Sequence, residues 1–243
     1  ELSTWFALES DDIDVPAALN VNNKYANDLN LDEPNRNVHN SELDSLPDTL
    51  IQLKDGFVRF DGRTVFDKLN FTLNKNEHWQ ITGPNGSGKT CLLQMFTGDN
   101  SHCYTNDLTI FGIKRGTGES IWDIKKHIGI MSNALHMQYK VNASVEHVII
   151  SGFHDSIGLY TRPTQAERMV AEQWLEVLGL KQKKNTPFQS LSFGDQRLVL
   201  IARSMVKHPA VLILDEPCNG LDDFNRQKAL KLRSIRRQGW SSC

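Results

Sequence analysis

A glycine-rich stretch is the sequence feature that most constrains this chain. Residues 83–90 read Gly-Pro-Asn-Gly-Ser-Gly-Lys-Thr. Residues 78–82 before it have the character of a short strand, and residues 90–96 after it read as a helix. In this context, consecutive backbone N–H groups and a helix N-terminus converge on an anion. A glycine-rich turn that binds nothing is the alternative, but the flanking strand and helix favour a phosphate-binding loop in an α/β fold.

The residue types in this stretch suit the chemistry of a nucleotide. Glycines at positions 83, 86 and 88 let the backbone approach phosphate oxygens with no Cβ in the way. Lys89 would place a point charge on the β- and γ-phosphates, and the Thr90 hydroxyl would ligate Mg²⁺. The full set predicted to contact ATP here is Gly83, Pro84, Asn85, Gly86, Ser87, Gly88, Lys89 and Thr90.

An acidic pair follows a short apolar run later in the chain. Residues 211–214 read Val-Leu-Ile-Leu, a length that suits only a fully buried strand, and Asp215-Glu216 come next. Asp215 would emerge at the carboxyl end of the strand and hold the Mg²⁺ shell. Glu216 would polarise the attacking water. Alone, such a pair is an ordinary strand end before Pro217; together with the phosphate loop it predicts ATP hydrolysis.

Two further motifs point to a family. Residues 191–196, Leu-Ser-Phe-Gly-Asp-Gln, resemble the signature motif of ABC-type ATPases, and residues 219–222, Asn-Gly-Leu-Asp, resemble the loop after their Walker B strand. The resemblance implies that Ser192 and Gly194 of one domain close over ATP held on the phosphate loop of another. Ser192 with Asp195 also fits a helix capping box, and both interpretations are compatible.

The resemblance implies two more site residues. Phe60 lies 23 residues before Gly83, where ABC domains place an aromatic ring that stacks on adenine. A phenylalanine at a strand end is also a common core residue, so both interpretations stay open. Asn133 stands where the family has a magnesium-sensing glutamine, and its side chain is one methylene shorter. We therefore expect Asn133 to reach the metal through water.

Three further segments narrow the resemblance to one group within the ABC family. Residues 77–81, 104–112 and 118–129 are similar to the second ABC domain of the ModF/PhrA group, from about Ile51 to Lys231. These are tandem-domain bacterial ATPases without transmembrane segments, linked by name to molybdate loci or photorepair. The implied fold is the α/β nucleotide-binding domain of ABC ATPases, with a P-loop core, an antiparallel β subdomain and a helical subdomain.

Charge divides the chain into two parts. Residues 1–49 contain 11 acidic and 2 basic side chains, whereas residues 50–243 contain 18 and 25. The first part is also rich in asparagine, which favours an interdomain linker, with residues 3–8 as the alternative end of a preceding domain. Residues 50–243 are predicted to form the ABC domain, with a helical insertion over about 100–190 that includes helices at 121–127 and from Thr164 to Gly179.

The C-terminal part departs from the family pattern. ABC domains carry a switch histidine after one further strand, and the resemblance places it beyond Cys243. Residues 226–237 are instead rich in arginine and lysine. We therefore expect a C-terminally truncated domain, without the last strand and the histidine, that binds ATP and hydrolyses it slowly. The basic segment fits either contact with nucleic acid or the end of a mixed-charge helix.

Composition limits the partners and the compartment. No apolar run approaches the ~20 residues that a membrane-spanning helix needs. The four cysteines lack metal-ligand spacing and are typical of reduced thiols. We expect a cytoplasmic protein; the alternative is a protein attached to the inner membrane.

Its expected partner is a second ABC domain, upstream in a longer chain or in another copy. The alternatives are the energy-coupling subunit of a molybdate-type importer, which needs a permease, and a role in DNA repair.

Overall fold

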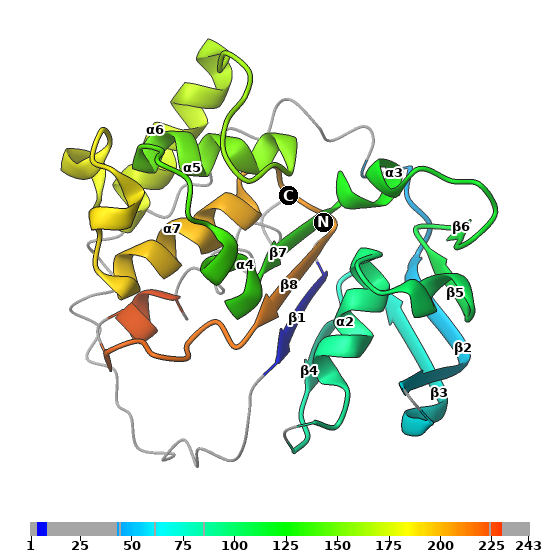
Figure 1. Ribbon diagram of the computed structural model, residues 1–243. Coiled ribbons are helices and arrows are strands. Elements are labelled where there is room, and N and C mark those ends of the chain that lie inside the picture. The colour runs from blue at the N-terminus through cyan, green and yellow to red at the C-terminus, as the bar shows by residue number, and fades with distance from the viewer. Residues whose placement is uncertain are drawn as a thin grey trace.

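Two four-stranded sheets and a group of helices make up the described part of the chain (Figure 1). The structure is a computed structural model that describes residues 4–8, 43, 45–60, 62–84, 86–223 and 225–229. One sheet is parallel, with the order β4-β1-β8-β7, and the other is antiparallel, with the order β3-β2-β5-β6. This is the α/β architecture with an antiparallel β subdomain and a helical subdomain that the sequence predicts.

The parallel sheet is built from short strands. Its members are β4 (His78–Ile81), β1 (Thr4–Leu8), β8 (Val211–Asp215) and β7 (Ile128–Met131). The first four residues of β8 are buried, as the apolar run at 211–214 predicts for a strand covered on both faces.

The antiparallel sheet is dominated by one long hairpin. It contains β2 (Thr49–Phe60), β3 (Arg63–Asn74), β5 (Asp107–Ile110) and β6 (Ile113–Lys114). The separate runs of alternating residues between positions 51 and 73 are therefore parts of two strands, and the register shifts between them mark irregular pairing. Gly62 has φ 79° in the turn, as expected there, while Asp61 lies outside the described residues.

Helices cover the parallel sheet. They are α2 (Lys89–Thr97), α3 (Ile121–Lys125), α4 (Asn133–Gln138), α5 (Val145–Ile150), α6 (Gln165–Leu178) and α7 (Phe193–Met205). Short 3₁₀ helices occupy Ser101–Tyr104, Ser151–His154, Lys181–Lys183 and Phe188–Ser190. The capping box at Thr164 and the left-handed Gly179 that ends α6 are both confirmed.

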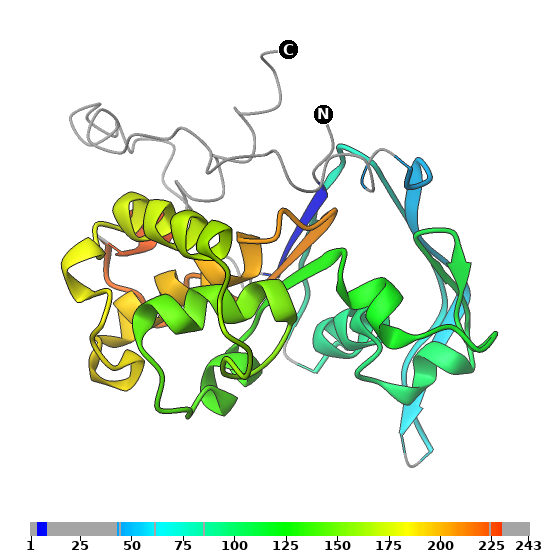
Figure 2. The ribbon, with the colours of Figure 1, turned by 90° about the horizontal axis from the view of Figure 1, so that it is seen from above.

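Alternate residues of β8 face two different cores. Val211 and Ile213 pack with the antiparallel sheet and α2, whereas Leu212 and Leu214 pack with α5, α6 and α7. Successive side chains of a strand point to opposite faces, so one short strand joins both cores. Figure 2 shows the corresponding arrangement, with α5–α7 on one side of the parallel sheet and the antiparallel sheet on the other.

The boundary predicted for the helical insertion needs correction. The sequence predicts it over about 100–190, but β5 and β6 pair within the antiparallel sheet and β7 pairs with β8. The helical part therefore begins near α4. Strands this short give little alternation, and no motif such as the glycine loop after β4 marks β5, β6 or β7.

The strand at the N-terminal end is a second difference. β1 lies between β4 and β8 and is parallel to both, with Leu8 opposite Ile81 on one side and Asp215 on the other. Residues 4–8 thus belong to the sheet of the nucleotide-binding region, a position that neither interpretation of residues 1–49 anticipates. Residues 9–42 lie outside the described part of the chain. The division at residue 49 otherwise stays a prediction.

The packing of α6 provides a test of the helical core. Trp174 is 2% exposed and belongs to the cluster formed with α5 and α7, whereas Met169 on the same helix is 54% exposed. We expect Trp174→Ala to lower the free energy of unfolding by about 3–5 kcal/mol because it leaves a cavity. Met169→Ala is the matched control, expected to change it by less than about 0.5 kcal/mol. Urea unfolding measures both, and equal losses would contradict the assigned burial.

Candidate nucleotide-binding site

The glycine-rich loop joins β4 to α2. β4 ends at Ile81 and α2 begins at Lys89, so the strand, loop and helix expected from the sequence are confirmed. Gly88 has φ 94°, and a Cβ built on it would lie 2.5 Å from Cγ1 of Val65 on β3. This position therefore needs glycine both for its left-handed backbone and for the close approach of β3. Asn85, predicted to be part of the loop, lies outside the described residues.

The Lys89 side chain reaches back over the loop. Its Nζ donates to the carbonyl oxygen of Gly83 and to that of Pro84, the latter at 3.2 Å. The Ser87 N–H also donates to the Pro84 oxygen, at 3.1 Å, which closes a turn within the loop. The positive charge of Lys89 therefore lies beside the loop, where an anion bound by the loop would meet it.

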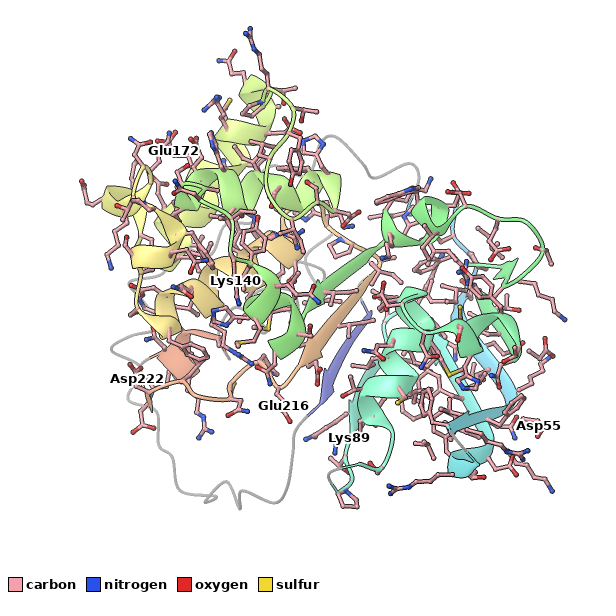
Figure 3. All side chains as sticks on the ribbon, viewed as in Figure 1. Asp55, Lys89, Lys140, Glu172, Glu216 and Asp222 are labelled. Atoms are coloured by element: carbon pink, nitrogen blue, oxygen red, sulfur yellow. The ribbon has the colours of Figure 1, made fainter. Side chains whose placement is uncertain are left out.

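The phosphate loop and the acidic pair meet at one edge of the sheet. β1 separates β4 from β8, and its Leu8 is level with Ile81 on one side and with Asp215 on the other. The two strands thus end at the same height, because parallel strands have their carboxyl ends at the same edge. Figure 3 shows Lys89 and Glu216 at this end of the molecule.

A pocket of about 370 Å³ opens at this edge. Its volume lies within the range typical of small-molecule sites. The residues that line it are Phe60, Arg63, Val65, Gly86, Ser87, Gly88, Lys89, Thr90, Cys91, Asp215 and Glu216. The structure thus brings together predicted residues from three separate stretches of the chain: the end of β2, the loop with the start of α2, and the end of β8.

The pocket has an electrostatic reason to bind a cation. Burial, and then the neighbouring charge of Glu216, raises the pKa of the Asp215 carboxyl, while Arg197 and Lys89 act in the opposite direction. A charged Asp215 is therefore costly unless a cation accompanies it.

The oxygen donors of the pocket suit Mg²⁺. Among the described residues, no group of three or more His, Cys, Asp or Glu side chains could enclose a metal ion. The pocket instead offers the Thr90 hydroxyl and the Asp215 carboxylate. Mg²⁺ is typically held by one or two such protein oxygens together with substrate phosphates and water. The residues present therefore fit a Mg²⁺ ion that enters with a nucleotide.

Phe60 lines the pocket and is not a core residue. It ends β2 with 46% of its surface exposed, and the edge of the His102 ring packs against it at 5.3 Å between ring centroids. Three residues that line the pocket were not predicted from the sequence: Arg63 and Val65 on β3, and Cys91 on α2. A signal existed for Arg63, because it is the hairpin partner of Phe60 across the turn.

Asn133 lies at the start of α4 and contacts the acidic pair directly. Its Nδ2 donates to Oε2 of Glu216 at 2.8 Å, and Asn219 Nδ2 donates to the same oxygen at 3.0 Å. Glu216 has φ 50°, an uncommon backbone conformation for a residue with a side chain. Sequence reasoning grouped Asn133 with the metal and did not anticipate this contact or the role of Asn219.

The signature-like residues lie at the N-terminus of α7, away from the pocket lining. The Ser192 hydroxyl accepts from the Asp195 N–H at 3.1 Å, while the Asp195 carboxylate pairs with Lys183 at 2.8 Å. Ser192 therefore caps the helix, but this is only half of the expected capping box, since the Asp195 carboxylate bonds Lys183. A Cβ on Gly194 would lie 2.3 Å from Nδ2 of Asn225, so a larger residue here would require the Asn225 side chain to move. Neither Ser192 nor Gly194 lines the pocket that contains Lys89.

Comparison with known proteins gives consistent matches. The family described as ABC transporter matches residues 66–219. The chain is 52% identical over 178 residues to the ABC transporter ATP-binding protein ModF of Escherichia coli, a match that covers 73% of this chain and 36% of ModF. It is 32% identical to the uncharacterized ABC transporter ATP-binding protein YmeB of Lactococcus lactis, over 75% of this chain and 70% of that one.

A solved structure agrees with the fold. CbiO1 from Clostridium perfringens, described as part of the ABC transporter complex cbiONQ, superimposes with a TM-score of 0.63 and 26% identity. The match covers 79% of this chain and 76% of that one. The chain spans only about a third of the length of the E. coli relative.

The raised pKa of Asp215 generates a prediction on stability. The folded state holds this proton more tightly than the unfolded chain, so ionised Asp215 costs folding free energy at neutral pH, and this cost disappears as the pH falls through the raised pKa. We expect Asp215→Asn to raise the melting temperature at pH 7 without metal or nucleotide, by about 2–4 °C for each kcal/mol removed.

Calorimetry across a pH series measures this effect. The exposed Asp223 supplies the matched control, Asp223→Asn, for which no change is expected. A rise for Asp215→Asn that shrinks at lower pH supports the assignment. A lower melting temperature for Asp215→Asn at pH 7 would show that the Asp215 charge stabilises the folded protein instead.

Proposed function

Because the chain belongs to the ABC transporter family of ATP-binding domains, we propose that it binds MgATP in this pocket and hydrolyses it. Members of the family are ATPases, bind ATP normally with Mg²⁺, and work as pairs of domains. The observation that carries the proposal is the meeting of Lys89, Thr90, Asp215 and Glu216 in one pocket. A phosphate loop alone would support nucleotide binding; the adjacent acidic pair supports hydrolysis.

Binding would use three parts of the pocket. The exposed ring of Phe60 would stack on the adenine, with Arg63 and Val65 beside it. The loop amides and Lys89 would hold the β- and γ-phosphates. Thr90 and Asp215 would hold Mg²⁺, which when bound neutralises phosphate charge.

Glu216 is proposed to orient the attacking water. Its carboxylate lines the pocket at the end of β8, one residue beyond Asp215. An ionised carboxylate only accepts hydrogen bonds, so it can hold a water molecule with one O–H directed at itself and a lone pair directed at the phosphate. Positioning of this kind provides most of the rate in phosphoryl transfer.

A second domain is proposed to complete the site. Ser192 and Gly194 lie outside the pocket of their own chain, at a helix N-terminus whose Phe193 is 48% exposed. A helix N-terminus attracts phosphate, so these residues would close over ATP bound to a second copy or to another ABC domain. The proposed cycle is closure with ATP and opening after hydrolysis.

The cellular process is proposed from the ModF resemblance. A role like that of ModF is the first candidate. The molybdate and photorepair links of the ModF/PhrA group, expected from the sequence, stay proposals. Coupling to a membrane permease is the second candidate, since the superimposed CbiO1 is part of a transporter complex. Within the described residues, no helix has the length and apolar character needed to cross a bilayer. Copurification with membranes would favour the importer, and stimulation of hydrolysis by DNA would favour repair.

Two substitutions separate binding from hydrolysis. We expect Lys89→Ala to weaken MgATP binding at least about tenfold, because a charge-assisted contact with the phosphates is lost. We expect Glu216→Gln to leave binding within about threefold of wild type and to lower phosphate release by about 100-fold or more. Calorimetric titration and a phosphate-release assay measure the two effects. Lys114→Ala, on the exposed β6, is the control; unchanged ATP binding by Lys89→Ala would sink the proposal.

The pairing of domains has its own test. With MgATP, Glu216→Gln should accumulate the closed pair, visible as a dimer by size-exclusion chromatography with light scattering. Adding Ser192→Arg should abolish that dimer through steric bulk and leave ATP binding intact, because Ser192 is outside the pocket of its own chain. A dimer that persists in the double variant would contradict the signature role.

A further inference from the structure

A buried guanidinium lies behind the acidic pair. Arg197 projects from α7 and is 1% exposed. Its Nε donates to the carbonyl oxygen of Pro217 at 2.9 Å, Nη2 donates to that of Glu216, and Nη1 donates to Asn133 Oδ1 at 2.7 Å. Its guanidinium carbon also lies 5.7 Å from the ring centre of Phe193. One side chain therefore contacts α4, α7 and the segment after β8.

The Arg197 contact determines which way the Asn133 amide points. A guanidinium has donors and no acceptor, so the amide oxygen of Asn133 must face it. The amide nitrogen then faces Glu216, and its 2.8 Å contact with Oε2 is a donated hydrogen bond. If the amide were reversed, it would oppose N–H to N–H at Arg197 and oxygen to oxygen at Glu216.

Arg197 thus acts on both the backbone and the side chain of Glu216. It binds the backbone oxygen directly, at a residue with φ 50°, and it orients the amide that binds the carboxylate. Asn133 and Asn219 both donate to Oε2. These contacts leave Oε1 as the carboxylate oxygen to accept from a water molecule.

The position of Arg197 is energetically costly. Burial lowers the pKa of its guanidinium, and the neighbouring Cys218, Glu216 and Asp215 oppose this shift. A buried charge is tolerated when it is paired and its hydrogen bonds are satisfied, and its presence is weak evidence for a gain in stability. Arg203, on the same helix, is also buried, but it bonds Ser151 and Ser156 in the helical part, away from the pocket.

We propose that Arg197 is a positioning residue for hydrolysis, which orients the Glu216 carboxylate through the side-chain amide of Asn133. The proposal rests on the proposed function of Glu216. It also gives Asn133 a different role from the magnesium contact expected from sequence, because in this structure its amide is bonded to Arg197 and Glu216.

The test measures MgATP affinity and phosphate release separately for the 243-residue chain. Arg197→Met and Asn133→Leu should lower kcat by about 10- to 100-fold, since small displacements of a catalytic group have effects of this size. Both should bind MgATP within about threefold of wild type, because neither residue lines the pocket. Asn133→Asp should lose as much as Asn133→Leu, because a carboxylate can accept from Arg197 but cannot donate to Glu216.

A control variant and a double-mutant cycle distinguish a positioning role of Arg197 from a general loss of structure. Arg203→Met removes a buried guanidinium from the same helix and should lower the melting temperature without changing kcat. In the Glu216→Gln background, Arg197→Met should cause no further loss of phosphate release, since both substitutions remove the same contribution. Equal effects of Arg197→Met and Arg203→Met on kcat, or independent effects of Arg197→Met and Glu216→Gln, would overturn the inference.

Failure of the proposed function gives a different result. If the wild-type chain binds no MgATP or releases no phosphate, the proposed function fails at that step. The hydrogen bond between Asn133 and Glu216 is then tested by melting temperatures measured without nucleotide. Asn133→Leu and Glu216→Ala combined should shift the melting temperature by an amount that differs from the sum of their separate shifts, because each removes one partner of the same hydrogen bond. Strict additivity would overturn the inference.

Discussion

The level alignment of β4 and β8 at one sheet edge is the constraint on which the site depends. Backbone pairing through β1 sets Ile81 and Asp215 at the same height. The phosphate loop leaves one strand and the acidic pair leaves the other, so a slip of one residue would move Asp215 away from Thr90 and reverse which faces of β8 meet the two cores. The alternating contacts of Val211 to Leu214 with those cores oppose such a slip.

Charge at this edge is balanced between opposite signs. Asp215 and Glu216 are adjacent, and burial together with their mutual repulsion raises the pKa of Asp215. Lys89 in front and Arg197 behind favour the charged form of Asp215. Ionised Asp215 is therefore favoured by a ligand that brings a divalent cation with it. The same balance explains why a positively charged side chain is tolerated in the interior beside α7.

Much of this could be predicted from sequence, and the misses have physical causes. The loop at 83–90, the strand at 211–214 and the capped helix after Thr164 depend on local patterns of glycine, apolar and capping residues, and the structure has all three. The strands β1 and β5–β7 were missed because they are short and lack the local signals that identify β4, which precedes the glycine loop, and β8, which is a continuous apolar run. Arg197 was missed because a single arginine beside the signature motif looks like any polar residue on a helix.

The sequence by itself therefore determined the residue types of the site and their chemistry, because a glycine loop followed by Lys-Thr, or a carboxylate pair after a buried strand, depends on neighbours along the chain. Only the tertiary structure decided which residues share the pocket and what each one contacts. Phe60 is exposed beside the loop, Ser192 is not part of the same pocket, and Asn133 is bonded to Glu216 and Arg197. Those relations join residues tens of positions apart, and they depend on strand register and helix packing, which no local pattern encodes.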